Sequence, residues 1–192
     1  MMECIDSTFG SAEGQTAVPT GPWTGHHFES CHFDGVAFGQ MDWRNARFEQ
    51  CTFFRCDLTE IRWTGAKLHG VKFDNCNLNG LRWNTLTTLF LKLELTQCQA
   101  TFGDWSDMEL NGARMLETDF TGADFSGTDA RKVDWSGSRL RDSIFQRTDL
   151  RESDLRTATN WSIDPAENKV RDARFSRSDL EGLIGRLGIC LD

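Results

Sequence analysis

The sequence predicts an all-β solenoid, and two periodicities in its 192 residues lead to that prediction. Trp23, Trp43, Trp63 and Trp83 recur every twenty residues, and a bulky residue falls at every fifth position between them. A period of five matches neither the 3.6-residue repeat of an α-helix nor the two-residue alternation of a strand. Four units of five per twenty residues therefore indicate a square coil, with a short extended segment on each side and a turn at each corner.

Two rows of side chains are expected to face the interior of each coil. The small row lies two positions before the large row and holds mainly small or apolar residues, whereas the other three positions of each unit are mostly polar. Because one coil cannot bury its own interior, the coils must stack through main-chain hydrogen bonds about 4.8 Å apart. Residues 21–160 would then form about seven coils and a rod of roughly 34 Å. The large row runs Trp23, Phe28, Phe33, Phe38, Trp43, Phe48, Phe53, Leu58, Trp63, Leu68, Phe73, Leu78 and Trp83.

The repeat then breaks once and resumes. Trp83 and Trp105 lie 22 residues apart rather than 20, so a two-residue insertion or bulge is expected within residues 84–104. The later units continue to Leu155, and residues 160–169 read as an irregular segment. We therefore predict residues 21–176 as the β-helix, residues 1–20 as either an N-terminal cap or a disordered segment, and residues 177–192 as a C-terminal helix and tail.

The C-terminal segment carries a helical signal. Ser178 and Glu181 fit a capping box, with Ser178 as the N-cap and Glu181 at the third helical position. Apolar residues then follow at spacings typical of one helical face: Leu180, Leu183, Ile184 and Leu187. Such a face can either cover the last coil of its own chain or pair with a second copy, and both alternatives stay open on the pattern alone.

Composition limits the class of partner. The formal charge of −8 excludes bulk attraction to nucleic acid or to an anionic membrane. No run approaches the ~18 apolar residues of a membrane span, and the acidic N-terminus does not resemble a secretory signal. A cytoplasmic protein is expected. The 14 Phe and 7 Trp without any Tyr indicate enclosed ring positions that offer no partner for a hydroxyl.

Catalysis, cofactors and metals are not expected. The seven Cys include no C-x-x-C pair and the four His lack zinc-ligand spacing, so buried free thiols are favoured. No nucleophile or phosphate-binding motif appears. The Ser residues at 138, 143 and 153 belong to the small inward row and are expected to line the core.

Individual units carry a family signature. Ala123-Asp124-Phe125-Ser126-Gly127 and Ser153-Asp154-Leu155-Arg156-Thr157 closely resemble the A(D/N)LXX repeat of pentapeptide-repeat proteins. The resemblance covers roughly residues 21–160 and again 173–180. It implies a right-handed quadrilateral β-helix, a handedness that the spacing alone does not show.

The chain ending narrows that resemblance. Residues 182–189 are similar to the terminal helix of the pentapeptide-repeat proteins that protect DNA gyrase, the Qnr, MfpA, McbG and AlbG group, which dimerise there. Residues 160–165 look like the break before the last coil in the McbG and AlbG immunity type. The resemblance implies a homodimer about 70 Å long, near two turns of B-DNA. Its expected interface is Leu180, Leu183, Ile184, Leu187 and Ile189.

Acidic residues gather in the second half of the repeats. They occupy the outward position just before the large row: Asp104, Glu109, Asp119, Asp124, Asp129, Asp134, Asp149 and Asp154. One interpretation is that they imitate a phosphate backbone, and another is that Asp suits corner turns by bonding nearby N–H groups.

The functional prediction is a DNA-mimicking protein that binds DNA gyrase, or topoisomerase IV, and confers resistance or self-immunity to an antibiotic or toxin aimed at that enzyme. It would bind neither nucleic acid nor membrane directly. The alternative is a scaffolding pentapeptide-repeat module with an unrelated protein partner. An enzyme that uses the His-bearing first coils ranks third.

Overall fold

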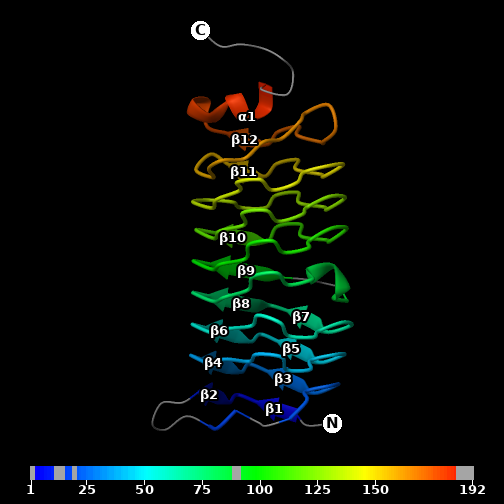
Figure 1. Cartoon of the computed structure of the whole chain (residues 1–192), viewed down its shortest axis with the longest axis vertical. Coiled ribbons are helices and arrows are strands. Elements are labelled where there is room, and N and C mark those ends of the chain that lie inside the picture. Colours follow the sequence, from blue (N-terminus) through cyan, green and yellow to red (C-terminus); the bar gives the residue numbers. More distant parts are fainter. Residues whose placement is uncertain (1–2, 11–15, 19–20, 88–91, 185–192) are drawn as a thin grey trace.

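The computed structural model is a rod of stacked coils, and it describes residues 3–10, 16–18, 21–87 and 92–184. The chain makes about eight turns and climbs the rod in sequence order from β1 to α1 (Figure 1). The predicted β-solenoid is confirmed. We number the four faces of a coil in chain order, so that face 1 carries the Trp23 and Trp43 column.

Parallel strands run along two of the faces. One sheet on face 2 contains β1 (Glu3–Ile5), β3 (His27–Glu29), β5 (Arg47–Glu49) and β7 (Lys67–His69). The second sheet, on face 3, contains β2 (Thr8–Gly10), β4 (His32–Asp34), β6 (Thr52–Phe54), β8 (Val71–Asp74), β9 (Leu93–Thr96) and β10 (Arg114–Leu116). A two-stranded sheet of β11 (Asp154–Leu155) and β12 (Arg174–Phe175) continues face 3. Single bridges such as Asp104↔Asp124 join the coils elsewhere.

The N-terminal segment extends the stack. β1 pairs with β3 through Cys4↔Phe28, and β2 pairs with β4 through Phe9↔Phe33. Phe9 is buried against Phe33, with ring centroids 5.0 Å apart. Residues 3–10 therefore form two sides of a further coil that covers the aromatic end of the core, and the sequence had left a cap and disorder as alternatives.

The inward rows form one continuous core. Trp23 and Trp43 stack with centroids 5.3 Å apart, and Trp83 and Trp105 stack at 4.0 Å. Apolar burial of this kind is the main stabilising contribution of a solenoid. The interior offers few acceptors, since five buried indole Nε1 groups find none among the described residues: Trp43, Trp83, Trp105, Trp135 and Trp161.

The last residue of most units turns the corner in a left-handed conformation. Gly65, Gly122 and Gly127 have φ of +74°, +70° and +71°. Glycine reaches this region without the Cβ clash that other residues meet. The turn closes through a hydrogen bond such as Ala123 N–H to the Phe120 carbonyl, 2.9 Å.

The register break is narrower than the predicted 84–104 window. Lys67 pairs with Thr87 at an offset of 20, whereas Val71 pairs with Leu93 at an offset of 22. The two extra residues therefore lie between Thr87 and Leu93. Leu93 and Leu95 are buried in β9, whereas Leu89 and Leu91 fall outside the described residues.

The C-terminal turn departs from the repeat and then returns to it. The pairs Arg139↔Thr159 and Asp149↔Lys169 both keep the offset of 20, so the segment between Thr159 and Asn168 leaves the ladder without changing the register. A single-turn 3₁₀ helix, η2 (Arg177–Asp179), precedes α1 (Glu181–Ile184), and another, η1 (Trp83–Thr85), lies on face 1.

The predicted N-cap is wrong. Ser176, not Ser178, caps the helical segment, because its hydroxyl accepts the Ser178 N–H at 3.2 Å. The segment starts earlier than predicted because a 3₁₀ turn precedes the α-helical turn. No described helix is long and apolar enough to cross a bilayer.

Candidate partner-binding surface

The eight predicted acidic residues wind around the rod rather than forming one stripe, because successive units occupy successive faces. Asp104 and Asp124 stack on face 1, and Asp119 lies on face 4 beside Arg139. Glu109, Asp129 and Asp149 stack on face 2. Asp134 and Asp154 stack on face 3.

Seven of the eight carboxylates also hold a corner turn. Each Asp accepts the backbone N–H of the residue two positions later, as Asp124 does from Ser126 at 2.8 Å and Asp119 from Thr121 at 2.9 Å. The same bond recurs at the other five aspartates: Asp104, Asp129, Asp134, Asp149 and Asp154. These aspartates therefore stabilise the corner turns. Any attraction of their charge to a partner would act in addition to that role.

Three of the aspartates are neutralised by an arginine of their own unit. The carboxylates of Asp129, Asp149 and Asp154 each meet the guanidinium two residues later at 2.6 Å. These hydrogen bonds lower the pKa of all three carboxyls from the ordinary value. The arrangement leaves little net charge at these corners. In the sequence, these paired aspartates are marked by an arginine two residues later in the same unit.

Five of the eight predicted carboxylates form no ion pair among the described residues, and three of them, Asp104, Asp119 and Asp124, lie on the adjoining faces 4 and 1. We call these three, together with Asp107 at the edge between faces 1 and 2, the acidic corner. They belong to two successive coils, and none of them forms an ion pair within the described part of the chain. Asp107 was not predicted, because it lies two positions after the large row; its signal was the repeated acid in Asp104-Trp105-Ser106-Asp107.

This region has a second feature, an exposed phenylalanine that the repeat pattern did not predict. Phe102 projects from the edge between faces 4 and 1 and is 72% exposed. It lies after the register resumes at Leu93. The sequence does mark Phe102 as unusual, because most residues two places after the large row are glycine or polar.

The predicted dimer residues are only partly described. Leu180 is 40% exposed, whereas Leu183 packs against the core. Gly182 lies against Trp161, and its carbonyl accepts the Ile163 N–H at 2.9 Å. The first turn of α1 thus covers the last coil of its own chain and leaves Leu180 outside. Ile184's side chain, and all of Leu187 and Ile189, fall outside the described residues.

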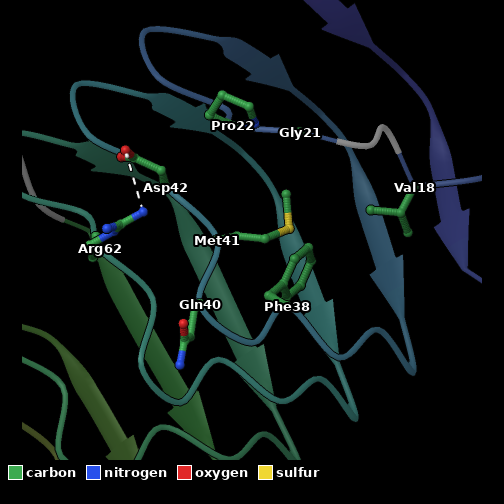
Figure 2. A pocket seen from close by; sticks show the side chains of 8 residues that line it. All are labelled: Val18, Gly21, Pro22, Phe38, Gln40, Met41, Asp42 and Arg62. Atoms are coloured by element: carbon green, nitrogen blue, oxygen red, sulfur yellow. Dashed lines mark ion pairs between the residues drawn. The ribbon is translucent and has the colours of Figure 1, made fainter.

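A cavity of about 700 Å³ lies near the N-terminal coils, away from the acidic corner. Val18, Pro22, Phe38 and Met41 form its apolar side, as Figure 2 shows. Asp42 pairs there with Arg62 at 3.8 Å, the contact drawn in Figure 2, and with Arg44 at 2.7 Å outside that view.

The buried polar groups serve the core. The hydroxyls of Ser138 and Ser143 donate to the carbonyls of Met115 and Phe120 in the preceding coil. The described cysteines are free, and burial raises the pKa of the Cys51 thiol to about 12. No group of three His, Cys, Asp or Glu side chains gathers as a metal site in the described ranges.

Family models place this architecture in a known class. A pentapeptide repeat region matches residues 26–102, and pentapeptide repeats match residues 94–127 and 118–156. The chain belongs to the pentapeptide-repeat family.

Solved structures resemble the chain over its whole length. Two trypsin-treated variants of QnrB1, a plasmid-mediated fluoroquinolone resistance protein, each match with a TM-score of 0.67, at 16% and 15% identity, covering 100% of this chain and 99% of theirs. Full-length QnrB1 matches with a TM-score of 0.49 and 16% identity over 98% of both chains. Identities this low show a shared fold. No curated protein matches the sequence.

Proposed function

We propose that this protein binds the DNA-binding surface of DNA gyrase, or of topoisomerase IV, and thereby confers resistance or self-immunity to an antibiotic or toxin aimed at that enzyme. The likeness to a fluoroquinolone resistance protein supports the class of target. Residues 160–165, which resemble the break before the last coil in the McbG and AlbG immunity type, favour self-immunity.

The acidic corner carries this proposal. About eight coils at ~4.8 Å make a rod of roughly 38 Å, close to one turn of B-DNA. A surface built to receive a duplex is cationic, so it attracts carboxylates that no arginine of the rod has already neutralised. Asp104, Asp119 and Asp124 meet that condition, whereas Asp129, Asp149 and Asp154 do not.

The same proposal includes a homodimer through the C-terminal segment. Leu180, Leu183, Ile184, Leu187 and Ile189 would form its interface, and two rods joined end to end would span about two turns of duplex. The exposed side chain of Leu180 supports this part of the proposal.

A matched pair of triple variants tests the acidic corner. Asp104→Asn, Asp119→Asn and Asp124→Asn together remove three unpaired charges. Asn keeps the turn, because Asn77 already accepts the Asn79 N–H at the same position. We expect binding to gyrase to weaken about tenfold or more at low salt, and inhibition or rescue of supercoiling to fall in parallel.

The control removes three charges that are already paired. Asp129→Asn, Asp149→Asn and Asp154→Asn change the net charge by the same amount, so an equal loss in both variants would mean that only total charge matters. If the first variant binds as tightly as the unmodified protein, charge mimicry at the corner is wrong. A protein that neither binds gyrase nor alters its supercoiling with any inhibitor would favour the scaffolding alternative.

A further inference from the structure

Phe102 is the most exposed large apolar residue in the described part of the chain. The others are Ile5 at 50%, Ile144 at 43% and Leu180 at 40%, so Phe102 at 72% is also the one aromatic among them. The remaining described Phe side chains are at least partly buried, and most lie in the core. A ring with this exposure contributes little hydrophobic stabilisation to the stack.

The backbone at Phe102 is equally unfavourable for a phenylalanine. Its φ is +55°, in the left-handed region, and every other described non-glycine residue at positive φ is polar. The coils above and below have Gly80 and Gly122 at the corresponding corner. Strain of this kind persists where function requires the residue, so the fold does not explain the choice of phenylalanine.

The neighbouring glycine gives the ring a fixed seat. A Cβ on Gly122 would come within 2.6 Å of the ring atoms Cδ1 and Cε1 of Phe102, so the ring lies directly over that residue. The main chain holds the same position, because the Phe102 N–H donates to the Thr121 carbonyl at 2.9 Å. A ring already held in place loses little entropy when it binds a partner.

Three carboxylates that form no ion pair among the described residues lie on the units next to this corner. Asp104 follows two residues later on the chain, and Asp119 and Asp124 flank Gly122 in the next coil. An exposed aromatic inside an acidic rim complements an apolar pocket whose edge carries Lys and Arg.

We propose that Phe102 is the anchor of the interface with the topoisomerase, inserted into an apolar pocket within that enzyme's cationic DNA-binding surface. The inference rests on the proposed function. Duplex DNA presents phosphates but no protruding aromatic ring, so Phe102 gives the protein a contact that imitation of charge alone lacks. That contact is insensitive to salt, whereas the attraction of the surrounding carboxylates is screened.

The test compares Phe102→Gly with the unmodified protein for binding to gyrase, at low salt and at about 0.5 M salt. Removal of a central aromatic anchor is expected to weaken binding by about tenfold or more at both salt concentrations. Glycine suits the backbone conformation, so the thermal midpoint should stay the same or rise. Phe102→Asn, which also tolerates positive φ, serves as a second variant.

The matched control is Asn75→Gly, which makes the same kind of backbone change at a corner of face 3, where φ is also +55°. Its binding should equal that of the unmodified protein. If both Phe102 variants keep full affinity while the unmodified protein binds gyrase, the anchor is wrong and the proposed function survives. If the unmodified protein does not bind gyrase, the proposed function fails and the anchor fails with it.

Discussion

At many corners of this rod a single carboxylate has two roles. It accepts a backbone N–H, which fixes the turn, and it either pairs with an arginine or leaves its charge on the surface. Asp42 illustrates the first outcome, since Arg44 donates to it through the side chain at 2.7–3.1 Å and through the backbone at 3.1 Å. These bonds lower the pKa of the Asp42 carboxyl from 3.8 to about 2.

This depressed pKa predicts how acid destabilises the protein. A carboxyl with a lower pKa in the folded state stabilises it above the unfolded pKa, near 3.9, and that stabilisation is lost as pH falls through about 2. We therefore expect Asp42→Asn to lose less stability than the unmodified protein between about pH 4 and pH 2. Urea unfolding at a series of pH values measures the difference. Equal slopes for both proteins would contradict the pairing with Arg44.

The position of an aspartate within its unit does not show whether it is paired with an arginine or leaves its charge on the surface. Asp124 and Asp154 occupy the same position in the five-residue unit. Asp124 forms no ion pair among the described residues, whereas Asp154 meets Arg156 at 2.6 Å. The difference lies in one residue, Ser126 against Arg156, two places later. Phe102 was missed for a related reason, because the sequence located the register break only within residues 84–104, a window that includes Phe102.

At the scale of elements, the C-terminal loop is tied to the last regular coil by one buried amide. Asn168 is 7% exposed and occupies the small inward row. Its Oδ1 accepts the Thr148 N–H at 2.9 Å, and its Nδ2 donates to the carbonyls of Phe145 at 3.0 Å and Asp164 at 2.9 Å. These bonds hold the end of the loop while its middle leaves the ladder.

Asn168→Ala should therefore destabilise the protein by about 2–3 kcal/mol, because buried groups lose their partners. Asn168→Thr is the matched variant, since Thr148 and Thr128 make the equivalent carbonyl bond in the same column, at 2.9 and 2.8 Å. It should recover part of the loss. Denaturant unfolding measures both, and an alanine variant as stable as the unmodified chain would show that the loop does not depend on this amide.

The periodic elements were predictable in detail, and the interruptions were predictable only as broad windows. Every fifth residue must face inward for the coil to close, so the pattern repeats and fixes the architecture. The two inserted residues follow no period, so the sequence located them only within residues 84–104. The pairing Val71↔Leu93 narrows that window.

At the scale of the whole molecule, the proposed dimer gives a hydrodynamic prediction. Leu180→Asp replaces the exposed apolar side chain of the C-terminal turn by a charged one and leaves the partly buried Leu183 unchanged. We expect the unmodified protein to sediment as a dimer and this variant as a 21.8 kDa monomer. Ile5→Asp, at the opposite end of the rod, is the control and should stay dimeric. A monomeric unmodified protein would rule out the dimer.

The short offset between paired residues also governs the order in which the chain can fold. Lys67 pairs with Arg47 and Thr87, twenty residues away on either side, and no ladder joins the first described coil to the last described one. Each contact between neighbouring coils therefore closes a loop of modest length, and its entropic cost does not grow with the size of the protein. During synthesis a coil can dock on its predecessor as soon as it leaves the ribosome, without waiting for the C-terminal residues.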